Sequence, residues 1–182
     1  MCKINFKKTL PYIGSILFMI ILSYIYFSPD ILEGKVLFQG DTQQGIAIGQ
    51  EGKAFREATG ETTRWTNSLF SGMPNFQISP SYANNYWMGQ IGRIYHLGLQ
   101  SPASLVFIMM LGFFILLSAM KIRWYLALVG AIAYAFSSYF FIIIGAGHIW
   151  KFITLAYIPP TIAGIILAYR GKYIGGAALI GF

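Results

Sequence analysis

The sequence predicts an all-α fold, a polytopic bundle of transmembrane helices with one large loop outside the membrane. Of the 182 residues, 56% are hydrophobic and only 10% are charged, whereas a soluble domain carries about a quarter charged residues. Four uncharged apolar runs have about the length that a helix needs to cross the roughly 30 Å hydrocarbon core. All six acidic residues lie between positions 30 and 61, outside these runs.

The net charge of +7 does not indicate a nucleic-acid partner, because the cations flank the apolar runs instead of forming one basic patch. The single cysteine, Cys2, can form no internal disulfide. The sequence also contains no nucleotide-binding glycine loop, no zinc-ligand spacing and no Gly-x-Ser-x-Gly motif. These absences exclude the common templates of soluble enzymes and leave the lipid bilayer as the first expected partner.

The first predicted span covers residues 10–27 and follows a basic start with Lys3, Lys7 and Lys8. A cleaved signal peptide has the same beginning, so it is the alternative interpretation. The exit from the run reads SYIYF at 23–27, which lacks the small residues of a cleavage site. We therefore predict an uncleaved first span.

The remaining runs predict three more complete spans, at 103–120, 125–145 and 152–169. The last of them contains Pro159 and Pro160, which remove two backbone donors and predict a kinked helix inside a packed bundle. Residues 173–182 begin a further apolar run and stop near half the length of a span. We expect the chain to be the N-terminal portion of a longer protein, with an unpaired stub as the alternative.

The short-loop cations predict the orientation of the spans. Seven of them fall on one side, which the positive-inside rule assigns to the cytoplasm: Lys3, Lys7, Lys8, Lys121, Arg123, Arg170 and Lys172. The N-terminus is then cytoplasmic, and the loop at 28–101 is extracytoplasmic. The short turn with His148 and Lys151 lies on the same outer side.

The outer loop is expected to carry short amphipathic helices. Apolar positions predict a helix over 42–59, although Gly45, Gly49 and Gly52 weaken it. Residues 71–75, SGMPN, form a turn signal. Apolar residues at helical spacing over 85–99 predict a helix lying in the membrane interface before the second span.

Asp41 is the first candidate for chemistry, because it follows the first span closely and stands among small and amide residues. A carboxylate there can accept a proton from a hydroxyl group, or bind a divalent cation through oxygen. The alternative is structural, since Asp41 immediately precedes the predicted helix at 42–59 and is a suitable N-cap.

Four cations are candidate phosphate-binding residues. Arg56 and Arg64 lie in the outer loop, where the guanidinium fork suits a phosphate or a sugar hydroxyl. Their alternative is a solvated helix face with weak surface ion pairs. His148 and Lys151 are three residues apart at the outer boundary, so one helical turn brings them to one face. For them the alternative is a snorkelling lysine beside the interfacial anchor Trp150.

Four motifs occur in a distinctive order: GDTQQ at 40–44, RWTNSLFSGMP at 64–74, GAGHIWK at 145–151 and AYIP at 156–159. Together with their positions relative to the spans, they resemble the N-terminal part of YfhO-family bacterial membrane proteins. That family is similar to the GT-C glycosyltransferases, polytopic enzymes that transfer a sugar from a polyprenyl-phosphate donor outside the cytoplasmic membrane.

The resemblance implies a GT-C-type transferase with a polyprenyl-phosphate-linked sugar as donor and a cell-envelope polymer as acceptor. Asp41 matches the acidic catalytic residue of the first outer loop, while Arg56, Arg64, His148 and Lys151 are weaker matches for binding. No Asp-x-Asp pair accompanies Asp41, so no metal is assigned and a divalent cation is left open. The alternative function is a non-catalytic transporter or flippase-like component for lipid-linked precursors, for which the Pro159-Pro160 helix would matter more than Asp41.

Overall fold

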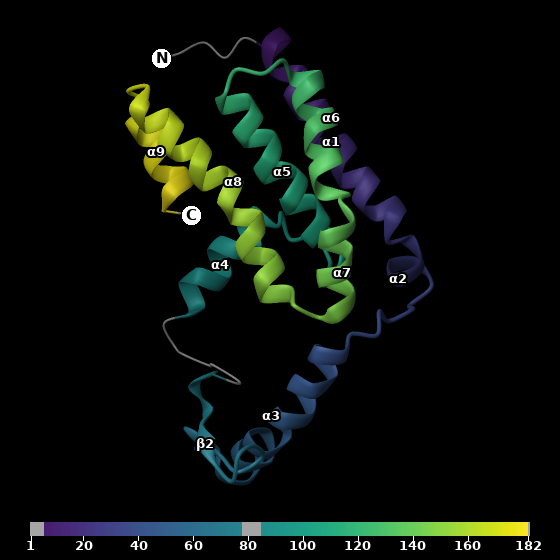
Figure 1. Ribbon diagram of the computed structural model, residues 1–182, viewed down its shortest axis with the longest axis vertical. Coiled ribbons are helices and arrows are strands. Elements are labelled where there is room, and N and C mark those ends of the chain that lie inside the picture. Colours follow the sequence, from purple (N-terminus) through teal and green to yellow (C-terminus); the bar gives the residue numbers. More distant parts are fainter. Residues whose placement is uncertain (1–5, 78–84, 182) are drawn as a thin grey trace.

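The computed structural model describes residues 6–77 and 85–181, and places Cys2, Lys3 and Phe182 outside the described part. Figure 1 shows two parts, a helical bundle and a smaller lobe below it. The bundle contains α1 (Phe6–Tyr26), α5 (Ala103–Ala119), α6 (Trp124–Ala135), α7 (Ser138–Ala146), α8 (Ile149–Tyr169) and α9 (Tyr173–Ile180). The lobe, residues 40–77, contains α3 (Gly40–Thr59), β1 (Trp65–Thr66), β2 (Met73–Pro74) and the 3₁₀ helix η1 (Asn75–Gln77).

The bundle identifies a helical membrane protein. Two stretches are long and apolar enough to cross a membrane, Thr9–Tyr26 within α1 and the whole of α8. The bent pair α6 and α7 provides a third if the two helices form one span. The predicted first and fourth spans are therefore confirmed as candidate membrane helices.

Helix α5 occupies the predicted second span and lies at the centre of the bundle, in contact with α1, α6 and α8. Its apolar residues lie on all sides of the helix, as expected of a buried helix. The stretch from Ala103 to Met110 is buried throughout. With 17 residues, α5 is about 26 Å long, slightly less than the roughly 30 Å hydrocarbon core. Four complete spans are consequently not shown.

The predicted third span is broken, which corrects the expectation of one straight helix over 125–145. It consists of α6 and α7, which meet at an angle of 45°. Ser137 lies in extended conformation at the break and is the N-cap of α7. Serine disfavours helix interiors because its hydroxyl competes for backbone hydrogen bonds. Aromatic packing accompanies the bend, since Tyr26 contacts both Phe136 and Phe141.

Glycines bring three helices into close contact. A side chain at Gly112 of α5 would place its Cβ 2.7 Å from the Ala156 carbonyl oxygen of α8. This carbonyl is four residues before Pro160, so it is one that the proline deprives of its helical donor. Helix α8 is nevertheless continuous through both prolines. Gly164 of α8 and Gly176 of α9 make a second close contact, which folds the short α9 back along α8.

One end of the bundle carries the flanking cations. Figure 1 places the start of α1, the α5–α6 turn and the α8–α9 turn together at the top. The Arg170 guanidinium donates a hydrogen bond to the Ala119 carbonyl, which joins the two turns. The lobe is attached at the opposite end of the bundle through α2 (Ser28–Leu32) and α4 (Asn85–Tyr95).

The lobe is a helix packed against a short hairpin. Helix α3 confirms the helix expected at 42–59, and the turn signal at 71–75 falls where the strands reverse direction. Glu51 of α3 joins this helix to the hairpin, because its carboxylate accepts hydrogen bonds from Thr66, Asn67 and Ser68 at 2.6 to 3.1 Å. The hydroxyl groups of Thr66 and Ser68 and the amide of Asn67 lower the pKa of Glu51 to about 2.

Candidate functional site

The candidate site lies where the first turn of α3 meets the turn between α7 and α8. The Gln39 side chain donates from Nε2 to the Ile144 carbonyl at 2.7 Å, and the Thr42 hydroxyl donates to Gln39 Oε1 at 2.9 Å. Gly147 has a φ of +92°, and a Cβ there would come within 3.0 Å of Thr42 Oγ1. A glycine at 147 therefore permits both the left-handed turn and the close approach of α3.

This contact brings together two predicted site residues that are far apart in the sequence. His148 Nδ1 lies 2.9 Å from Asp41 Oδ2, and each side chain is about half exposed. His148 is the N-cap residue of α8, and Asp41 lies in the first turn of α3. The carboxylate is therefore near the positive end of the α3 dipole.

The pair has the arrangement of a base and its orienting partner. A neutral imidazole that carries its proton on Nδ1, the nitrogen nearest the carboxylate, has Nε2 as its acceptor nitrogen. A carboxylate that holds an imidazole in this tautomer stabilises the imidazolium formed when Nε2 takes up a proton. The Asp41 carboxylate also keeps acceptor capacity of its own. The geometry thus suits removal of a proton from a hydroxyl group that enters from solvent.

The N-cap interpretation of Asp41 is wrong, because Gln39 is the N-cap residue of α3 and the helix begins at Gly40. A divalent cation also finds little support at this position. Such ions take six or more oxygen ligands, several of them from the protein in the case of Ca²⁺. Within residues 6–77 and 85–181, no three His, Cys, Asp or Glu side chains come together as a metal site.

Lys151 lies one helical turn after His148 but has a different partner. Its Nζ is 5.7 Å from the centre of the Tyr139 ring, a cation–π contact between α8 and α7. Both Lys151 and Tyr139 are exposed, as is Trp150 between the two predicted cations. Lys151 is thus available to an anion beside the Asp41–His148 pair.

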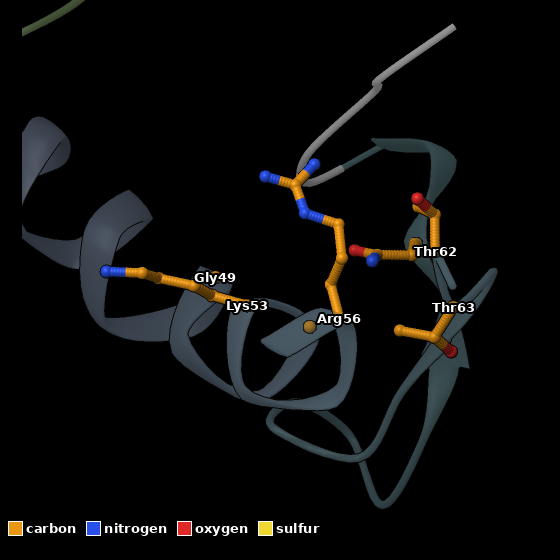
Figure 2. A pocket seen from close by; sticks show the side chains of 7 residues that line it. Gly49, Lys53, Arg56, Thr62 and Thr63 are labelled. Atoms are coloured by element: carbon orange, nitrogen blue, oxygen red, sulfur yellow. The ribbon is translucent and has the colours of Figure 1, made fainter. Parts of the chain in front are cut away.

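The two predicted arginines lie elsewhere. Arg56 is 15 residues after Asp41 on α3, about 22 Å along the helix axis. It lines a pocket of 130 Å³ together with Gly49, Gly52, Lys53, Thr62, Thr63 and Asn75 (Figure 2). Arg64 is not among the lining residues, and its carbonyl accepts the Asn75 backbone hydrogen bond at 2.8 Å. The predicted phosphate-binding set therefore divides into two separate places.

A cavity lined mainly by apolar residues, with Asp30 among them, reaches Ile144, whose carbonyl binds Gln39 beside the Asp41–His148 pair. It occupies 350 Å³ between the end of α1 and α7 and includes Phe27, Leu37 and Phe141 in its lining. A neighbouring cavity of 330 Å³ shares Leu37 with it and reaches Gln39, the residue that anchors α3. The polar pair is thus next to space that can accept hydrocarbon.

Several residues of this region were not predicted from the sequence. Gln39 and Gly147 hold the contact between α3 and the α7–α8 turn, and Glu51 shapes the lobe. Only Gly147 had a local signal, since a glycine directly after the end of a helix is typical of a left-handed turn. The role of Gln39 depends on Ile144, 105 residues away in the sequence. The role of Glu51 depends on Thr66, 15 residues away.

Comparisons with protein-family models, with curated proteins and with solved structures found no match to this chain. The family resemblance and the activity that it implies therefore stay predictions. The class that the fold and the site define is a helical membrane protein with a carboxylate–imidazole pair at one end of its bundle.

Proposed function

We propose that this chain is the N-terminal part of a GT-C-type membrane glycosyltransferase. In this proposal the enzyme transfers a sugar from a polyprenyl-phosphate donor to a hydroxyl group of a cell-envelope polymer. The observation that supports it most is the 2.9 Å contact between Asp41 and His148. Two residues singled out separately from the sequence meet in a geometry that suits general-base catalysis.

The reaction assigns a role to each group. The Asp41–His148 pair accepts the proton of the acceptor hydroxyl while its oxygen forms a bond to the anomeric carbon of the sugar. The bond between that carbon and the phosphate oxygen breaks, and its electron pair leaves with the polyprenyl phosphate. Lys151 stabilises the charge on this phosphate, and the apolar cavity lined by Phe27 and Phe141 accepts part of the lipid.

The proposal includes an orientation in the bacterial cytoplasmic membrane. The N-terminus and the turns with Lys121 and Arg170 face the cytoplasm, as the positive-inside rule requires. The lobe and the Asp41–His148 pair then lie on the outer side. Helix α5 and the bent α6–α7 pair each count as one span, which makes four, and α9 begins a fifth.

The decisive experiment measures transfer of labelled sugar from polyprenyl-phosphate-sugar to envelope polymer, in membranes containing the protein at its full natural length. We expect Asp41→Asn to lower transfer by about 100-fold or more, the size of a general-base contribution. Glu61→Gln is the matched control, because Glu61 is an exposed acid of the same outer loop that lines neither of the two cavities. Its transfer should stay at the unmodified level.

Membrane abundance must be equal in the two variants, so that lost transfer reports on chemistry. Equal transfer by Asp41→Asn and the unmodified protein would contradict the proposal. His148→Gln provides a second measurement, because the proposal requires the imidazole next to Asp41 and loss of it should also lower transfer.

The bent α6–α7 pair favours a second candidate, a transporter or flippase-like component for lipid-linked precursors. Broken helices near a substrate site are typical of transporters that alternate between two open states. Here we expect Asp41→Asn to be tolerated and Pro159→Ala to slow movement of a fluorescent lipid-linked sugar across proteoliposome membranes. The same two variants therefore distinguish the candidates, because the glycosyltransferase proposal expects the larger loss of function from Asp41→Asn and the transporter candidate expects it from Pro159→Ala.

A further inference from the structure

The lobe contains a second polar site, separate from the Asp41–His148 pair. Its pocket lies between α3 and the chain that leads into and out of the hairpin, and Figure 2 shows Lys53 and Arg56 on one side with Thr62 and Thr63 across from them. We propose that this pocket binds an oxyanion, in the first place a phosphate group. The inference does not depend on the glycosyltransferase proposal.

The volume of the pocket suits a group of that size. A single water molecule needs about 10–15 Å³ of such space, and the pocket offers 130 Å³. Gly49 and Gly52 contribute no side chains on the α3 side, so the helix surface stays open there. The glycines that weaken the helical pattern of the sequence thus have a place in the structure, since two of the three line this pocket.

The charges of the lining residues favour an anion. Across residues 6–77 and 85–181, no carboxylate forms an ion pair with Arg56. Lys53 has only a long contact to Glu57, at 3.8 Å, with both side chains largely exposed. A guanidinium without a partner can present two parallel donors to a phosphate. In Figure 2 the Lys53 side chain extends away from the Arg56 guanidinium, so Lys53 adds its positive charge at the edge of the pocket.

Uncharged donors complete the site. In the described part of the chain, the Thr62 hydroxyl and the Asn75 carboxamide have no hydrogen-bond partner, although both line the pocket. The Thr63 hydroxyl is already engaged with the Trp65 backbone. Glu51 keeps this wall in place from the other side of α3, because its five hydrogen bonds fix the segment from Thr66 to Ser68.

The test measures binding by titration calorimetry with the complete chain in nanodiscs of phosphatidylcholine at low ionic strength. The probes are inorganic phosphate and glycerol 3-phosphate, and flotation with vesicles of phosphatidylglycerol or phosphatidylcholine tests a lipid headgroup. We expect Arg56→Gln to weaken binding at least about tenfold, the loss of one charge-assisted hydrogen bond. Lys35→Gln is the matched control, because Lys35 is an exposed lysine outside this pocket.

Two further variants exclude a trivial loss of fold. Gly49→Leu places a side chain into open space of the pocket and improves helix propensity, so it should block binding while the thermal stability is kept. Glu57→Gln removes the competing carboxylate and should tighten binding.

Binding that depends on Arg56 supports the site with any of the probes. Binding to soluble phosphates assigns it to a soluble phosphoryl group, and binding to phosphatidylglycerol vesicles alone assigns it to a lipid headgroup. No measurable binding, or equal affinity of the unmodified protein, Arg56→Gln and Gly49→Leu, would overturn the proposal.

Discussion

At the scale of single residues, the lobe depends on one carboxylate. Glu51 is partly exposed on α3 and accepts hydrogen bonds from two hydroxyl groups, two backbone amides and one carboxamide. The ionised form makes all five at once, and this is why the pKa of Glu51 falls to about 2. Thr66, the first of these donors, is almost completely buried against it.

The first residue-scale prediction concerns Glu51→Gln. Glutamine keeps one neutral acceptor oxygen for the four donors that share Oε2, and its NH₂ group faces the Asn67 carboxamide donor, so that bond is lost and the other four lose the charge of their acceptor. We expect faster hydrogen–deuterium exchange in peptides covering 64–72, with little change in the bundle. Glu57→Gln on the same helix is the control, and equal exchange in the two variants would contradict the role of Glu51.

The depressed pKa also predicts how the lobe responds to acid. Because the folded pKa of about 2 lies below the ordinary value of 4.5, Glu51 stabilises the folded lobe fully above pH 4.5. That contribution declines as the pH falls from 4.5 towards 2. Exchange in 64–72, corrected for the intrinsic rate, should rise over this interval in the unmodified protein and stay flat in Glu51→Gln. The same rise in both proteins would assign the acid response to other groups.

Local sequence identified residues at this scale but not their partnerships. Asp41 and His148 were each predicted as site residues with different roles, a base and a phosphate ligand. Their contact spans 107 positions and depends on the docking of α3 through Gln39 and Gly147, which no local pattern encodes. The interpretation of Asp41 as an N-cap failed because α3 begins two residues earlier than the apolar pattern indicates.

At the scale of elements, the bundle is held by close helix contacts at glycines. In a membrane, helix association relies on van der Waals packing and backbone proximity, for which small residues are needed. Gly112 lets α5 approach the Ala156 carbonyl of α8, which has no helical donor because residue 160 is a proline. The Tyr95 hydroxyl of α4 also lies next to Gly112. Tyr95 is buried, and this burial raises the pKa of its hydroxyl.

This contact predicts that Gly112→Ala destabilises the bundle. The added Cβ would lie 2.7 Å from the Ala156 carbonyl oxygen, so α5 and α8 must separate. Overpacking of this kind costs about 1–3 kcal/mol, and the midpoint of thermal unfolding in detergent should fall. Gly14→Ala in α1 is the control, because its Cβ meets nothing within 4 Å and alanine favours the helix. Similar midpoints for the two variants would contradict the packing argument.

The sequence predicted where helices occur better than where they bend. Hydropathy located the helices now seen as α1, α5 and α8 within a few residues, because apolar length is a local property. The break between α6 and α7 was missed, since 125–145 is uncharged throughout. What decides the bend is the extended conformation of Ser137 and the packing of Phe136 and Phe141 around Tyr26, both of which need the neighbouring helix.

At the scale of the whole molecule, the cationic turns and the candidate site lie at opposite ends of the helical bundle. The cationic turns at Lys121 to Arg123 and at Arg170 to Lys172 lie together at one end of the bundle, where Arg170 reaches the Ala119 carbonyl. The lobe and the Asp41–His148 pair are at the other end. The helices therefore have the lengths and the sidedness of charge that the positive-inside rule requires for one orientation.

The orientation can be tested with single cysteines, because replacing Cys2 by serine removes the only native one. We expect Glu61→Cys in the lobe to react with a membrane-impermeant maleimide in intact cells. Lys172→Cys, at the cationic end, should react only after the membrane is opened, since the proposed orientation puts that end in the cytoplasm. Both positions are exposed, so access to the reagent depends on the side of the membrane. A cytoplasmic marker protein controls for leakage. Labelling of Lys172→Cys in intact cells with Glu61→Cys protected would reverse the orientation, place the lobe in the cytoplasm and remove the basis for transfer to an envelope polymer.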